Sequence, residues 1–229
     1  VDATFLSKKN LNLFIKEQII DAKKQNVLFS LHMKATMMKI SDPIIFGHFV
    51  KVFYEPVIQK HEEILAKLEI NFNNGIGEFY EKLGKNTEIT PQQKSEIESD
   101  LKELQDNRPN LAMVDSDKGI TNLHVPNNII IDASMPAAIR SSGKMFGNDG
   151  KLYDTKFIIP DSSYAPLYTA TIENCISHGA LDPTKTGTVQ NVGLMAKKAE
   201  EYGSHTSTFE APENGIIRII FENGQTLHE

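Results

Sequence analysis

The chain of 229 residues contains a single cysteine, Cys175, so it cannot form an internal disulfide and suits a reducing, cytoplasmic compartment. It has no apolar segment near the roughly 18 residues that are needed to cross a membrane. The first residues also lack the basic region and the apolar core of a signal peptide. Because the sequence begins with valine rather than methionine, we expect that it is processed or cut from a longer protein.

Basic residues do not cluster in this sequence. The 24 lysines and arginines form no long run, and the formal net charge is −6. This balance argues against a nucleic-acid scaffold, so we expect neither a nucleic acid nor a membrane as a partner. The length allows one large domain or two small ones and is sufficient to bury a hydrophobic core.

Helix and strand patterns alternate along the chain, which is typical of an α/β protein. Thr90-Pro-Gln-Gln93 matches a capping box at the start of a charged surface helix. The glycine-rich segment 140–151 predicts a loop, without the spacing of a phosphate-binding loop. The elements that we expect are helices at 6–25, 42–54 (resumed after Pro56 to 68), 91–105, 163–178 and 192–202, and strands at 27–31, 111–114, 129–131, 157–159 and 216–221.

The segment 125–136, VPNNIIIDASMP, suggests a ligand site. Its three isoleucines, 129–131, predict a short strand buried on both faces, and Ser134 and Pro136 are start signals for a helix. Asp132 would then lie at the carboxyl edge of the sheet, where ligands bind in open α/β proteins. Two interpretations of Asp132 stay open: a ligand-facing carboxylate, often for a divalent metal, or a cap for the next helix.

Two further polar residues follow predicted elements. Lys34 comes just after the buried strand at 27–31, and burial disfavours the charged form of a lysine, which can then act as a base or proton relay. The alternative is a lysine that extends along the rim of the sheet. Tyr202 stands at the end of the predicted helix 192–202 and could donate a proton, although it could equally be a packing residue.

Other metal motifs are weak. His32, His48 and His205 lack the spacing of zinc ligands, so a zinc site is not expected. Asp115-Ser-Asp117 is followed by Lys118-Gly119, a pattern that is more typical of a turn than of a metal site.

Three long motifs carry a resemblance to a known family. They are SLHMKATMMKISDPIIFGH at 30–48, IIIDASMP at 129–136 and GTVQNVGLMAKKAEEYGSH at 187–205. The chain resembles the monomeric, NADP-dependent isocitrate dehydrogenases of bacteria along nearly its whole length. The resemblance implies an α/β fold with a mostly parallel sheet flanked by helices, isocitrate/isopropylmalate dehydrogenase-like, with a helix-rich N-terminal half. It also implies that residues 1–229 are an internal part of the large substrate- and metal-binding domain, with possible lobes at 1–108 and 109–229.

The resemblance implies roles for the candidate residues. Asp132 matches an aspartate that binds the catalytic Mg²⁺ or Mn²⁺, and Tyr202 matches the tyrosine regarded as the proton donor. The essential lysine should lie in residues 33–39; Lys34 is preferred over Lys39, because dimeric isocitrate dehydrogenases place theirs at the first of two lysines in a similar setting. Isocitrate would be the substrate, NADP the cofactor, and the full-length enzyme a monomer.

The family's substrate clamp, its other metal-binding aspartates and most of its NADP contacts have no counterpart in this chain. We therefore expect the isolated chain neither to turn over isocitrate nor to hold a metal tightly, because one aspartate cannot fill a six-coordinate magnesium shell. We also expect apolar faces to be exposed, through which the isolated chain can self-associate. The alternative is a non-catalytic α/β domain that retains these motifs for packing or partner binding.

Overall fold

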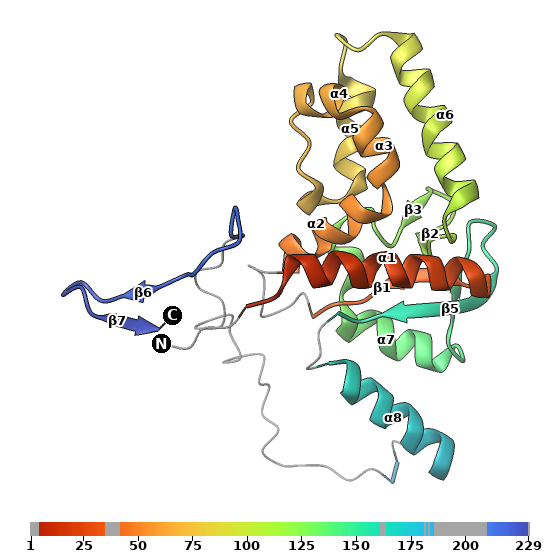
Figure 1. Ribbon diagram of the computed structural model, residues 1–229. Helices are drawn as coiled ribbons and strands as arrows, with labels where there is room; N and C mark the ends of the chain where they lie inside the picture. Colours follow the sequence, from red (N-terminus) through yellow and green to blue (C-terminus); the bar gives the residue numbers. More distant parts are fainter. Residues whose placement is uncertain are drawn as a thin grey trace.

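In a computed structural model, which describes residues 5–34, 42–160, 164–180, 182, 184–185 and 210–228, helices surround a small mixed sheet (Figure 1). Within these residues five strands form the main sheet in the order β1-β5-β4-β2-β3. The strands are β1 (Leu28–Leu31), β2 (Met113–Asp115), β3 (Ile120–Thr121), β4 (Lys144–Phe146) and β5 (Leu152–Ile158).

The first helix and the first strand confirm the sequence prediction. Helix α1 (Lys8–Gln25) begins after Ser7, whose hydroxyl accepts a hydrogen bond from the backbone N–H of Asn10, and it ends at Asn26 in the left-handed conformation. Every residue of β1 is buried, as expected for an apolar strand inside the core. One face of α1 is buried with β1 in the central hydrophobic cluster; the helix residues in it are Leu11, Ile15, Ile19 and Ala22.

A helical half follows, drawn in orange to yellow above α1 in Figure 1. It contains α2 (Asp42–Phe53), α3 (Glu55–Lys60), α4 (Glu62–Lys67), the 3₁₀ helix η1 (Phe72–Asn74), α5 (Ile76–Lys85) and α6 (Pro91–Asn107). The start at Asp42 and the interruption near Pro56 agree with the prediction. The capping box at Thr90 is confirmed, since the Thr90 hydroxyl accepts from the N–H of Gln93 and the Gln93 side chain accepts from the N–H of Thr90.

The expected mostly parallel sheet is present only in part. β1 and β5 pair in parallel, and two isolated parallel bridges join Phe29 to Leu111 and Met33 to Ile130. The pairs β5·β4, β4·β2 and β2·β3 are antiparallel. Short turns connect β2 to β3 and β4 to β5, and such turns return the chain antiparallel to itself, whereas β2 and β4 pair across the longer segment that contains α7. The chain is therefore α/β with a mixed sheet.

The prediction of a strand at 129–131 is wrong. Pro126 opens a 3₁₀ helix, η2 (Pro126–Ile129), and Ile131 already begins α7 (Ile131–Arg140). Within this run only Ile130 makes a β-bridge, an isolated parallel one to Met33. Ile129 and Ile131 are buried as expected, but in helical turns, since a short apolar run is compatible with either structure. Asp132 consequently lies in the first turn of a helix.

The C-terminal part contributes α8 (Ala165–His178), below α7 in Figure 1, and a two-stranded ribbon of β6 (Ile219–Ile220) and β7 (Thr226–His228). α8 has no buried residue, although it carries leucine and isoleucine side chains. The predicted helix at 192–202 lies outside the described residues. None of the described helices is long and apolar enough to span a membrane.

Candidate functional site

The structure brings Lys34 and Asp132 together. The Lys34 ammonium nitrogen lies 2.8 Å from Oδ1 and 2.7 Å from Oδ2 of Asp132, so it donates to both carboxylate oxygens. The Lys34 side chain is 11% exposed and that of Asp132 is 44% exposed. A largely buried ammonium thus faces a carboxylate that solvent, or a ligand, can still reach.

Backbone hydrogen bonds around Met33 set this geometry. The Met33 N–H donates to the carbonyl oxygen of Ile129 at 2.8 Å, and the Ile131 N–H donates to the carbonyl oxygen of Met33 at 2.9 Å. The segment that leaves β1 is thereby fixed to the segment that enters α7. Lys34 follows Met33 by one residue and Asp132 follows Ile131 by one residue, so their side chains emerge side by side.

Asp132 occupies the first turn of α7 without serving as its N-cap. The N-cap position is Ile130, which makes no side-chain capping bond. A carboxylate in the first helical turn interacts favourably with the positive end of the helix dipole. The cap interpretation of Asp132 is therefore wrong, and the interpretation as a ligand-facing carboxylate stays a prediction.

His32 and Ser134 form a second, buried link between the same two elements. His32 Nδ1 lies 2.6 Å from Ser134 Oγ, and its Nε2 lies 2.7 Å from Ser30 Oγ. The histidine is fully buried, and burial lowers its pKa to about 3. The imidazole is therefore neutral at physiological pH, and it links a buried strand to the helix that carries Asp132.

Tyr164, the N-cap residue of α8, and Tyr168, in the first turns of that helix, lie near the Lys34–Asp132 pair. The Lys34 ammonium lies 5.7 Å from the centre of the Tyr164 ring, within cation–π range. The Tyr168 hydroxyl donates to the carbonyl oxygen of Ile131 at 3.4 Å, and burial together with the nearby Asp132 carboxylate raises the pKa of Tyr168. The sequence interpretation did not identify these residues. Their four-residue spacing on a predicted helix, which places both on one face, was the available signal.

The remaining predicted site residues cannot be placed beside this pair. Tyr202 and Lys39 lie outside the described residues, so the preference for Lys34 over Lys39 stays a prediction. Two open hollows of about 640 and 620 Å³ border α5; the described residues that line them come from the helical half and the 124–125 segment. The Lys34–Asp132 site is thus a surface of this chain rather than one of these hollows.

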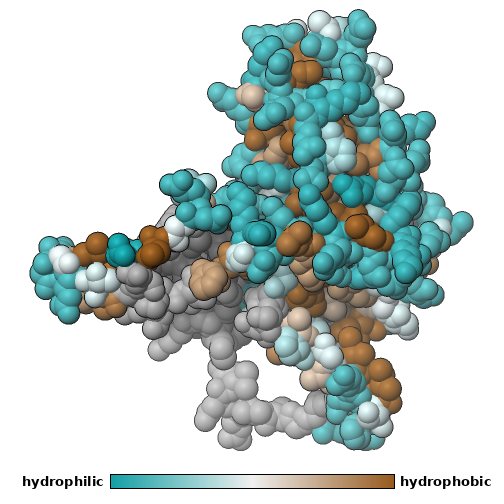
Figure 2. All heavy atoms as spheres, in the orientation of Figure 1, coloured by the Kyte–Doolittle hydropathy of each residue, from teal (hydrophilic) through white to brown (hydrophobic). Residues whose placement is uncertain are grey.

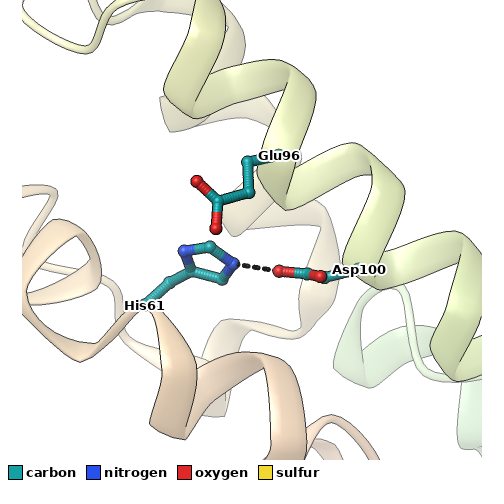
Figure 3. Close-up of side chains that lie close together, drawn as sticks. All are labelled: His61, Glu96 and Asp100. Atoms are coloured by element: carbon teal, nitrogen blue, oxygen red, sulfur yellow. Dashed lines mark hydrogen bonds and ion pairs between the residues drawn. The ribbon is translucent and has the colours of Figure 1, made fainter.

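A second cluster of ionisable groups joins α6 to the junction of α3 and α4 (Figure 3). His61 Nε2 lies 2.6 Å from Asp100 Oδ2, and Glu96 approaches from one turn earlier in α6. The ligand atoms of His61, Glu96 and Asp100 lie within 4.8 Å of one another, as in a metal site. However, the Lys60 ammonium lies 2.8 Å from Asp100 and 3.3 Å from Glu96, so a cation already neutralises both carboxylates. We interpret the cluster as an ion-pair network that holds α6 in place.

The protein is thus an α/β protein in which a lysine and an aspartate form an ion pair between the end of β1 and the start of α7. The chain belongs to the monomeric isocitrate dehydrogenase family, whose model matches residues 1–229. It is 54% identical over 230 residues to the NADP isocitrate dehydrogenase of Azotobacter vinelandii, covering 100% of this chain and 30% of that relative. It is 53% identical to NADP isocitrate dehydrogenase 2 of Psychrobacter sp. (strain 13A), covering 31% of that protein. With NADP isocitrate dehydrogenase 2 of Mycobacterium tuberculosis the identity is 50% over 96% of this chain and 29% of the relative. The chain therefore spans about 30% of the length of these relatives.

Proposed function

We propose that these residues act in an NADP-dependent isocitrate dehydrogenase, which oxidatively decarboxylates isocitrate to 2-oxoglutarate and CO₂. The observation that carries the proposal is the contact between Lys34 and Asp132, two residues that are 98 positions apart in sequence. Family membership and identities of 50–54% to enzymes named for this activity support it. We further propose that the chain is an internal part of the large substrate- and metal-binding domain, with an isocitrate/isopropylmalate dehydrogenase-like arrangement.

Asp132 fits the role of a ligand for Mg²⁺ or Mn²⁺. Its carboxylate offers hard oxygen donors, which these ions prefer, and it is 44% exposed. One carboxylate fills one or two of about six coordination positions, so further ligands have to come from water, substrate and other residues. When bound, the metal stabilises negative charge that develops on the substrate oxygen.

Lys34 is placed to handle the proton of the substrate hydroxyl. Its ammonium nitrogen lies within hydrogen-bonding distance of the carboxylate that would hold the metal, so a hydroxyl bound there would also lie near the lysine. We assign to Lys34 the relay of this proton, which it takes up as a neutral amine after its ammonium has released a proton to solvent, and to Tyr202 the donation of a proton to the enolate carbon. As an ammonium, Lys34 also carries positive charge toward an anionic substrate, which favours binding of carboxylates.

The test is the rate of NADPH formation by the complete enzyme that contains these residues. Lys34→Ala should lower turnover by about 10²–10⁴-fold, the usual contribution of a positioned proton donor or acceptor. Lys118→Ala is the matched control, because Lys118 pairs with Asp115 in an exposed turn and should leave turnover unchanged. Near-normal turnover of Lys34→Ala would refute the role and favour a non-catalytic domain. The isolated 229-residue chain should form no NADPH.

A further inference from the structure

The hydrogen atoms between Ser30, His32 and Ser134 can be assigned one by one. The Ser134 hydroxyl donates to the carbonyl oxygen of Ile130 at 3.0 Å, so its oxygen has to accept from His32 Nδ1 at 2.6 Å. A neutral imidazole carries one N–H, which leaves Nε2 as an acceptor. The Ser30 hydroxyl lies 2.7 Å from Nε2 and 3.2 Å from Met145 Sδ, and we assign its hydrogen to the imidazole nitrogen, because a thioether sulfur is the weaker acceptor. The result is a directional chain of three hydrogen bonds from β1 to the start of α7.

The residues of this hydrogen-bond network lie close in sequence to the proposed active pair. His32 precedes Lys34 by two residues, and Ser134 follows Asp132 by two residues. Ile130, which receives the last hydrogen bond, is the N-cap of the helix that carries Asp132. These buried hydrogen bonds thus connect the first turn of α7 to the end of β1, two residues from Asp132 and from Lys34.

We infer that His32 and Ser134 are positioning residues that orient the Asp132 carboxylate for a divalent cation. The inference rests on the proposed function, since it assumes that Asp132 binds the metal. Groups that hold a metal ligand in place through hydrogen bonds typically change metal affinity by about 10–100-fold when they are removed. Loss of the Ser134 hydroxyl leaves the N–H of His32 without its acceptor and removes the side-chain link between the two elements, so that only the backbone hydrogen bonds at Met33 hold the start of α7.

The residue types explain why this link is rigid. His32 is fully buried and stays neutral, so it is a fixed donor on one side and a fixed acceptor on the other. Its ring also packs against Phe157 of β5, with ring centres 5.2 Å apart, which limits rotation of the imidazole. A serine at 134 has a short side chain that can reach both Nδ1 and the carbonyl oxygen of Ile130.

The test measures the dissociation constant of Mn²⁺ for the complete enzyme, by electron paramagnetic resonance of free Mn²⁺, together with the melting temperature. Ser134→Ala should weaken Mn²⁺ binding by about 10–100-fold. Ser134→Thr, which keeps a hydroxyl, should restore most of the affinity. Ser116→Ala is the matched control, because the Ser116 hydroxyl also donates to a backbone carbonyl, that of Gly147 at 3.0 Å, and should not change the affinity.

If Ser134→Ala does not fold, the comparison of two His32 variants decides. His32→Asn retains a side-chain N–H for Ser134, whereas His32→Leu removes it, so the asparagine variant should bind Mn²⁺ more tightly than the leucine variant. Equal affinities of these two, or an unchanged affinity of a folded Ser134→Ala enzyme, would overturn the inference. Asp132→Asn in the same assay separates the two proposals: if it too binds Mn²⁺ normally, the proposed function itself is wrong.

Discussion

Lys34 donates to both carboxylate oxygens of Asp132, at 2.8 and 2.7 Å, across 98 residues of sequence. A divalent cation at Asp132 would therefore share this carboxylate with a positively charged group, which repels it. We expect two consequences of the lysine: the proton relay proposed above, and competition with the metal for the same carboxylate.

Lys34→Ala separates these two effects in one protein. Without the ammonium, the Asp132 carboxylate remains hydrated at 44% exposure, so Mn²⁺ affinity should stay the same or rise while turnover falls. The melting temperature should change little, because a partly exposed ion pair contributes about 0–1 kcal/mol. Calorimetric titration with Mn²⁺ measures the first effect. A large loss of Mn²⁺ affinity would contradict competition and indicate that Lys34 organises the site instead.

Removal of the hydroxyl group tests whether Tyr202 or Tyr168 is the proton donor. Tyr202→Phe should lower turnover by about 10²–10⁴-fold if Tyr202 is the proton donor. Tyr168→Phe should have a small effect, because the Tyr168 hydroxyl makes one long hydrogen bond, 3.4 Å, to the carbonyl oxygen of Ile131. Steady-state NADPH formation by both variants of the complete enzyme provides the measurement. The opposite ranking would transfer the proton-donor role to Tyr168.

The ion-pair network on α6 should make stability sensitive to acid. The Lys60 ammonium, and then the His61 hydrogen bond, hold the pKa of Asp100 below its ordinary value of 3.8. A carboxyl group whose folded pKa is lowered stabilises the fold above 3.8, and this contribution is lost as the pH falls through the folded pKa. Asp100→Asn should therefore lower the melting temperature at pH 7 by about 2–4 °C, the shift that about 1 kcal/mol produces in a domain of this size.

The difference between Asp100→Asn and the unaltered chain should begin to shrink below pH 3.8 and disappear as the pH falls through the lowered pKa of Asp100 in the folded chain. Glu96→Gln is the control, because the Glu96 side chain is 55% exposed and its pair with Lys60 should contribute little. Thermal unfolding followed by circular dichroism from pH 7 to pH 3 gives both curves. A difference in melting temperature between Asp100→Asn and the unaltered chain that stays the same at pH 3 would rule out the electrostatic explanation.

Helix α8 presents apolar side chains to solvent, seen as brown spheres at the lower right of Figure 2. Leu167 is 55% exposed, Ile172 39% and Ile176 78%. We predict that the isolated chain self-associates through the side of α8 that carries Ile172 and Ile176, and that Ile176→Ser raises the dissociation constant roughly tenfold, since burying such a side chain contributes about 1.5–3 kcal/mol. Sedimentation velocity over a range of concentrations measures it, with Thr171→Ser as the control. A strictly monomeric chain at all concentrations would be the opposite outcome.

Local patterns were sufficient for much of the fold. The periodicity of α1, the buried run of β1 and the capping box at Thr90 depend on neighbouring residues, and each was predicted at nearly its observed position. The strand β4 was missed because it lies in the glycine-rich segment 140–151, which was predicted as a loop. Its extended conformation depends on pairing with β5, a contact that composition does not reveal.

The candidate site was likewise predicted only in part. Lys34 and Asp132 were predicted because each follows an apolar run, and motif resemblance assigned them to one site. The run at 129–131 was assigned to the wrong structure, because a short apolar run fits a strand or a helical turn equally well. The link from His32 to Ser134 and the approach of Tyr164 to Lys34 were not predicted, since they join residues about 100 or more positions apart.

Binding of Mn²⁺ to the complete enzyme and to its Asp132→Asn variant tests the assignment of Asp132 most directly. The amide keeps the size of the side chain but removes the negative charge that attracts a hard cation. We predict that Asp132→Asn, with an unchanged melting temperature, binds Mn²⁺ at least about tenfold more weakly and forms NADPH far more slowly. Equal Mn²⁺ affinity and equal turnover of the two proteins would show that this carboxylate is not a metal ligand.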